Sequence, residues 1–147
     1  MRPFIRAAAA LLLLAAAACA GDAPSQDEFV TLRAALSSTQ QVPPNLAGGG
    51  GDATVTFDRV SKRMTWLVDY YSLSGALTGA HFHGPAASNA TAPVTVPMTP
   101  RASPLAGSTT LGPRDEADLL AGRWYVNLHT TTHPAGELRG QLRETRR

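Results

Sequence analysis

Apolar and polar positions alternate with a period of two along most of the chain, which is typical of half-buried β-strands. The stretches FVTLRAALS, residues 29–37, and ATVTFD, residues 53–58, both follow this pattern. A polar turn leads into MTWLVDYY, residues 64–71, and predicts a hairpin with the strand before it. The period returns in WYVNLH, residues 124–129, and in a last strand around Leu138. The pattern therefore predicts several short strands.

Glycine and proline separate these strands. QQVPPNLAGGGGD, residues 40–52, is expected to be a loop, because a diproline and four glycines suit neither a helix interior nor a central strand. Residues 84–109 contain several prolines and one alternation at 94–98, which predicts a long excursion with a single edge strand. Early acids followed by Gly122 predict one short helix near 115–121. The expected fold class is all-β, a single antiparallel β-sandwich or barrel of Greek-key type.

The first residues differ from the rest. Residues 1–18 place two arginines before a run of alanine and leucine, which is typical of a secretory signal peptide. Small residues precede Cys19, the single cysteine, in LAAAACAG, and this stretch resembles a bacterial lipobox. The resemblance implies cleavage before Cys19 and its acylation, with residues 19–27 as a tether to a domain over 28–144 and a tail over 145–147. Ordinary cleavage nearby, which would leave a free thiol, is the alternative.

The lipobox resemblance also predicts location. It implies an exported protein that is held at the lipid bilayer through Cys19. Position 20 is Ala rather than Asp, which by the sorting rule of such lipoproteins favours the outer membrane, facing the periplasm or the cell surface. Arg2 and Arg6 lie in the segment that would be removed, and the remaining basic residues equal the 11 acidic ones in number. No electrostatic case for nucleic acid remains.

Two histidines lie two positions apart in GALTGAHFHGP. On a strand, His81 and His83 share a face with Gly79, while Ala80 and Phe82 point to the other side. The alternation of the later strand likewise directs His129 away from its apolar face. Neutral imidazole binds copper and zinc well, so these three histidines are candidate metal ligands. The alternative is that they hydrogen-bond to neighbours on an exposed strand face.

The motifs FVTLRAALSSTQQVPPN, LTGAHFHGPA and LLAGRWYVNLHTTTHPAGELRGQL resemble those of the CHRD domain, named after chordin, over about residues 28–143. This resemblance implies an extracytoplasmic β-sandwich and says little about activity. The histidine pattern is also similar to that of copper/zinc superoxide dismutases, which implies that His81, His83 and His129 match copper ligands. On the same comparison, Arg139 stands near the place of a substrate-guiding arginine.

Two classes of function therefore remain open. The first is a noncatalytic envelope lipoprotein whose domain binds a protein or glycan partner, and the sequence favours it. The second is a copper or zinc protein that uses the three histidines, with dismutase-like activity as a further alternative. Around such a metal, Asn127 and Glu137 would orient His129 from the final hairpin, and Arg139 would act beside them. No nucleophile motif or phosphate loop indicates another enzyme class.

Overall fold

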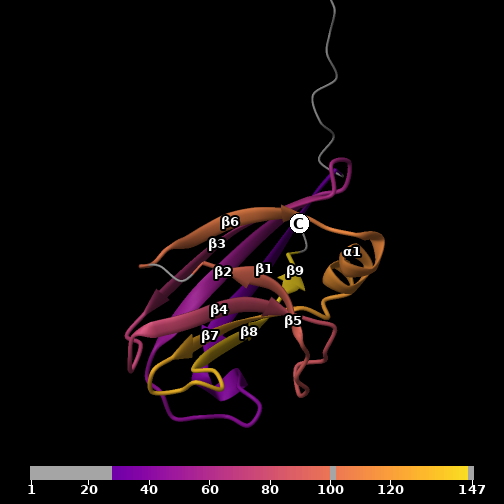
Figure 1. The fold of residues 1–147 in the computed structure, drawn as a ribbon. Helices are drawn as coiled ribbons and strands as arrows, with labels where there is room; N and C mark the ends of the chain where they lie inside the picture. The colour runs from indigo at the N-terminus through magenta and orange to yellow at the C-terminus, as the bar shows by residue number, and fades with distance from the viewer. Residues whose placement is uncertain (1–27, 100–101, 146–147) are drawn as a thin grey trace, which may run out of the picture.

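The computed structural model describes residues 28–99 and 102–145. The expected leader over 1–18, Cys19 and the expected tether over 19–27 lie outside the described residues. Strands dominate, with one short α-helix and one 3-10 turn (Figure 1). The elements are β1 Phe29–Ser37, η1 Ser38–Gln40, β2 Gly50–Asp58, β3 Arg63–Tyr71, β4 Leu77–His83, β5 Val94–Met98, β6 Leu105–Thr110, α1 Pro113–Leu120, β7 Tyr125–Thr130, β8 Leu138–Gln141 and β9 Arg143–Glu144.

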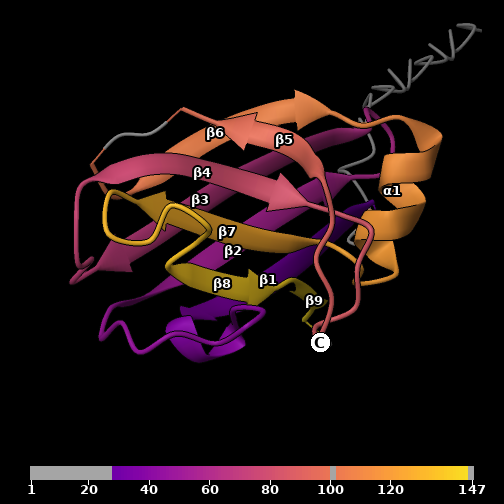
Figure 2. The same ribbon diagram turned by 60° about the horizontal axis from the view of Figure 1, so that its bottom comes forward.

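All strands belong to one antiparallel sheet in the order β5-β4-β7-β8-β1-β2-β3-β6, with β9 paired to β1. The sheet curls into a nearly closed barrel, and α1 lies at one end of it (Figures 1 and 2). The neighbours β4 and β7, β8 and β1, and β3 and β6 are not consecutive in the chain. These crossing connections bring the histidine-bearing strands β4 and β7 side by side. The expected all-β sandwich or barrel with one short helix is confirmed.

The inward side chains of the strands form one core. Phe82 of β4 meets Trp66 of β3 edge to face, with the ring centroids 5.3 Å apart, and its ring centroid lies 6.3 Å from that of Trp124. Since β3 and β4 are not neighbours in the sheet, the Phe82–Trp66 contact joins strands that lie far apart in the strand order. Ala80 and Phe82 are fully buried in this core. The alternation of β4 therefore directs His81 and His83 to the outer face.

Several element boundaries differ from the prediction. β2 begins at Gly50, so the last three residues of the expected loop belong to a strand, where a side chain at Gly51 would collide with the carbonyl oxygen of Asp69. The excursion over 84–109 contributes to two strands, because Leu105–Thr110 adds a second edge strand beside β3. The helix covers Pro113–Leu120 and so begins two residues early, with proline at its first position.

Within the described residues, no helix is both long enough and apolar enough to cross a membrane. The helix α1 is only eight residues long, and it caps the end of the barrel rather than lying apart from it (Figure 2). Its buried Leu119 belongs to the core cluster.

Trp66 shares the inner face of β3 with the fully buried Met64 and Val68, and is itself half-buried. We expect Trp66→Ala to lower the free energy of unfolding by about 3 kcal/mol, because it removes the ring that packs on Phe82. Urea denaturation followed by circular dichroism measures this loss. The matched control is Leu67→Ala on the opposite, more exposed face, which should cost well under half as much. Equal losses would contradict the assigned orientation of Trp66.

Candidate metal centre

Three histidines meet on the outer face of the sheet. His81 and His83 come from β4, and His129 comes from β7, where the strand register places it beside Gly79. One ring nitrogen of each histidine lies within 4.8 Å of the other two. The centroid of the His81 ring is 5.5 Å from that of His83 and 5.0 Å from that of His129. The structure thus brings together all three histidines that the sequence singled out.

Gly79 makes room for this cluster. A Cβ atom at Gly79 would lie 3.1 Å from Cε1 of His81, which is tighter than ordinary van der Waals contact. The same Cβ would lie 3.6 Å from Cδ2 of His129. The glycine therefore allows an imidazole from each of two neighbouring strands to cover the same point of the sheet.

Backbone carbonyls orient two of the rings. Nδ1 of His83 lies 2.9 Å from the oxygen of Ala92, and Nδ1 of His129 lies 3.0 Å from the oxygen of Pro134. A carbonyl oxygen only accepts, so in each neutral ring Nδ1 carries the proton and Nε2 keeps a free lone pair. In metal sites, a histidine ligand is oriented in this same way through its other nitrogen.

Buried nitrogens without partners mark the centre of the cluster. Nδ1 of His81, Nε2 of His83 and Nε2 of His129 are all buried, and none hydrogen-bonds to any part of the chain that the structure describes. Leaving a buried polar atom unpaired costs free energy. A shared ligand that accepts three lone pairs would remove this cost at all three atoms together. A metal cation has this property.

The electrostatics favour neutral rings. Burial lowers the pKa of His81, and the neighbouring His129 and His83 lower it further, because each would oppose a second positive charge. Burial also lowers the pKa of His83; the hydrogen bond to Ala92 opposes this shift, and the charges of His129 and Arg139 add to it. The lone pairs of His81 and His83 are therefore free at neutral pH.

The distances suit a small ion after minor adjustment. Two nitrogens bonded to one zinc or copper ion at about 2.0–2.1 Å lie no more than about 4 Å apart. The present separations of up to 4.8 Å exceed this limit slightly. Binding of a single ion would therefore require the ring nitrogens to move closer together. Three protein ligands also leave one coordination position open for water or another small molecule.

Beyond His83, the contacts continue to two further residues, Tyr125 and Arg139. Tyr125 of β7 stacks on His83 with ring centroids 4.9 Å apart and planes 6° from parallel. Its hydroxyl accepts a hydrogen bond from the backbone amide of Ala92 at 3.1 Å, so His83 and Tyr125 both bind the backbone of the same loop residue. Cζ of Arg139 lies 3.7 Å from the centroid of the Tyr125 ring. Because β7 runs between β4 and β8, Tyr125 lies between His83 of β4 and Arg139 of β8.

The other polar residues named from the sequence mainly hold loops. Asn127 accepts a hydrogen bond from Nε2 of Gln41 at 2.6 Å. Glu137 accepts hydrogen bonds from the Ser74 amide and hydroxyl at 2.7 Å each and from the Thr130 hydroxyl at 2.6 Å. His129 is oriented by a backbone oxygen in the β7–β8 turn instead. A role of Asn127, Glu137 and Arg139 toward a metal stays a prediction.

Sequence reasoning missed the orienting groups. The carbonyls of Ala92 and Pro134 carry no residue-specific signal, because every residue has a carbonyl oxygen. The position of Tyr125, in contrast, was predictable from the sequence. It alternates with Asn127 and His129 on the outer face of β7, so the period of two already placed it on the histidine side.

Comparison of the chain with known proteins identifies one matching family model. A family model described as the CHRD domain matches residues 32–142, which include all three histidines. Searches of curated proteins and of solved structures found no match.

Glu137 offers a test of the polar layer around the site. Burial would raise the pKa of this fully buried carboxyl, but the hydrogen bonds from Thr130 and Ser74 outweigh burial and hold the pKa below 4.5. The stability that it provides is therefore present above pH 4.5 and is lost as pH falls through the folded-state pKa. We expect Glu137→Gln to lower the free energy of unfolding by about 1–3 kcal/mol at neutral pH. The same substitution should make the free energy of unfolding less dependent on pH in acid solution. Chemical denaturation between neutral and acidic pH measures both effects, and an unchanged pH dependence in acid solution would contradict this account.

Proposed function

The chain belongs to the CHRD domain family, and we propose that it binds one copper ion, with zinc as the alternative metal, through His81, His83 and His129. The observation that carries this proposal is the convergence of three buried ring nitrogens that have no partner among the described residues. A histidine pair on an exposed strand face would instead direct its nitrogens to water or to neighbouring polar groups. Imidazole suits both metals, and affinity for such sites generally favours copper over zinc.

The protein supplies three parts of such a centre. The strands β4 and β7 fix the positions of the ligands, the carbonyls of Ala92 and Pro134 fix the orientation of two rings, and the core beneath keeps the sheet rigid. Copper bound there would supply a redox-active ion with an open position, whereas zinc would supply a Lewis acid. The proposal is a metal-binding module, and storage or delivery needs no further group from the chain.

A titration of the metal-free protein with copper(II), and separately with zinc, tests this site. We expect one equivalent of copper to bind. His81→Ala and His129→Ala should each lose this stoichiometric site, because each removes one of three ligands. Since burial holds the pKa of both His81 and His83 below 6.5, protons should displace the metal only in acid solution. Calorimetry gives the stoichiometry, and paramagnetic resonance identifies nitrogen ligands to copper(II).

His133→Ala is the matched control. His133 lies in the turn after β7 and is outside the cluster, so its loss should leave the copper site intact. Retained binding in both His81→Ala and His129→Ala would overturn the proposal, as would equal weakening in His133→Ala. The copper-loaded protein is also assayed for superoxide dismutation. A positive result would extend the site to catalysis, and a negative one would exclude the dismutase-like alternative.

We further propose that the protein is an exported lipoprotein, anchored through acylated Cys19 in the outer membrane, and that its domain binds a protein or glycan partner in the cell envelope without catalysis. The support is the apolar leader over residues 1–18, the small residues before Cys19 and the polar tether over 19–27. Anchoring would hold the metal site close to the membrane surface.

Mass spectrometry of the protein purified from its own membrane tests the anchor. We expect the first residue to be Cys19, with a mass increase from fatty acyl groups. Cys19→Ser should remove the acylation and release the protein from the membrane fraction, because the sulfur atom carries the lipid. An N-terminus at Met1, or an unmodified residue other than Cys19, would contradict lipidation.

A further inference from the structure

Arg139 is the last member of a stack of side chains that begins at the histidine cluster. Its Cζ atom lies 3.7 Å from the centroid of the Tyr125 ring, and that ring stacks on His83 with the centroids 4.9 Å apart. The two distances together place the guanidinium carbon within about 9 Å of the centroid of the His83 ring. A positive charge therefore lies close to the cluster without touching it.

The charge of Arg139 is buried and has no partner of opposite sign. Its side chain is 1% exposed. Nη2 donates to the carbonyl oxygens of Ala87 at 3.2 Å and Ala90 at 2.8 Å, and both acceptors are neutral. Within residues 28–99 and 102–145, the guanidinium joins no ion pair. Because water and salt screen a buried charge only weakly, its field extends to the neighbouring groups.

This field reaches the histidines. Burial is the main reason that the pKa of His83 is lowered, and the positive charge of Arg139 lowers the pKa further, because it opposes a proton on the ring. A metal ion bound at Nε2 of His83 would carry its charge at nearly the same place. Coulomb repulsion is proportional to charge, so Arg139 opposes a doubly charged ion about twice as strongly as a singly charged one.

The cluster itself does not offset this repulsion. Its three members are neutral imidazoles, and within the described part of the chain no carboxylate belongs to it. On the side away from Arg139, the strand register pairs His81 with Pro97 and His83 with Val94, so the neighbouring side chains of β5 there are apolar. Zinc usually has four ligands and copper(II) a tetragonal set, and the cluster supplies only three.

We propose that the buried charge of Arg139 makes the histidine cluster prefer Cu(I), which carries one charge, to Cu(II), which carries two. This inference rests on the metal centre proposed above and specifies the ion that occupies it. Arg139 acts through its electric field across Tyr125, and it does not contact the metal.

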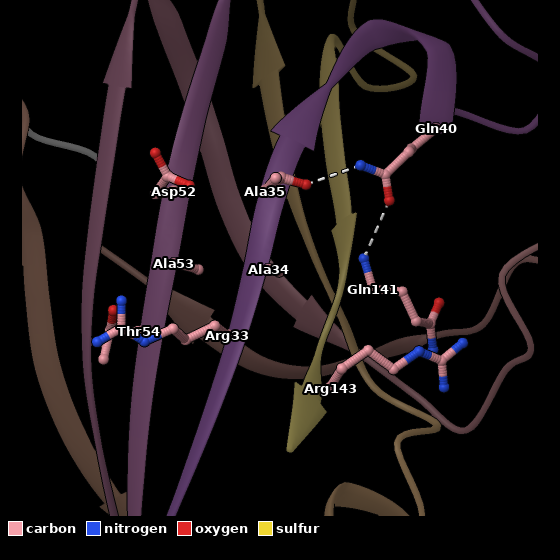
Figure 3. A pocket seen from close by; sticks show the side chains of 9 residues that line it. All are labelled: Arg33, Ala34, Ala35, Gln40, Asp52, Ala53, Thr54, Gln141 and Arg143. Atoms are coloured by element: carbon pink, nitrogen blue, oxygen red, sulfur yellow. Dashed lines mark hydrogen bonds between the residues drawn. The ribbon is translucent and has the colours of Figure 1, made fainter. Parts of the chain in front are cut away.

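Two other arginines on the outside of the sheet provide a contrast. Arg33 of β1 and Arg143 of β9 line a hollow of about 340 Å³ and extend away from one another (Figure 3). Both are exposed, so water and salt screen their charges. The strand β8 also separates β1 from the histidine-bearing strand β7. Arg33 therefore carries the same charge as Arg139 without the burial or the stacked ring, and it serves as the matched control.

Competition titrations of the metal-free protein under argon test the proposal, with bicinchoninate as the competitor for Cu(I) and glycine as the competitor for Cu(II). We expect the wild-type protein to bind Cu(I) more tightly than Cu(II). Arg139→Gln should lower the ratio of the Cu(II) to the Cu(I) dissociation constant about tenfold, because one buried positive charge is lost. Arg139→Lys should keep most of the wild-type ratio, because it keeps the charge. Since both ions use the same ligands, the ratio is insensitive to general damage to the site.

Asn127→Asp provides a second variant that leaves the contacts of Arg139 with the loop in place. Asn127 lies opposite Arg139 in the strand register and accepts a hydrogen bond from Gln41, which an aspartate of the same shape also accepts. Its negative charge offsets that of Arg139, so the ratio should again fall. Arg33→Gln should leave the ratio unchanged. Circular dichroism shows whether each variant is folded.

The outcomes separate this inference from the metal centre on which it rests. An unchanged ratio in Asn127→Asp or in folded Arg139→Gln, or an equal fall in Arg33→Gln or Arg139→Lys, would overturn the role of Arg139. Wild-type protein that binds Cu(II) as tightly as Cu(I) would do the same. If neither ion binds to the wild-type protein, the metal centre itself is wrong, and this inference is overturned with it.

Discussion

A layer of polar side chains is buried on the outer face of β7 and β8, and the need to satisfy its hydrogen bonds determines how the covering loops lie. Glu137 and Arg139 are almost completely inaccessible although they face away from the core. Glu137 holds the loop before β4 through Ser74, and Arg139 holds the loop after β4 through two carbonyls. These hydrogen bonds hold the loops on either side of β4 against the sheet, next to the histidine cluster.

The two faces of β4 differ in their need for hydrogen bonds. Its inner side chains, Ala80 and Phe82, complete an apolar core that needs no hydrogen bonds, whereas His81 and His83 on its outer side have ring nitrogens that do. A shift of the strand by one residue would exchange the two sets and place imidazoles in the core. The register is therefore fixed by the core, and the geometry of the histidine cluster follows from it.

Much of this arrangement was predictable from the sequence, because alternation depends only on the local order of residues. The strand over 29–37, the hairpin at 58–63 and the face shared by His81 and His83 all follow from a period of two. The strand over 105–110 did not, because its small and polar residues carry little alternation and it forms by pairing with β3. Long-range pairing also placed Gly50 in a strand.

The two imidazoles of His83 and His129 are oriented by main-chain oxygens of Ala92 and Pro134, not by side chains. Any amino acid at those two positions would present the same acceptor if the loop kept its path. The orientation of these two rings therefore depends on the path of the loops rather than on the amino acids at positions 92 and 134. The ring nitrogens themselves, in contrast, depend on a histidine being present at each of the three strand positions.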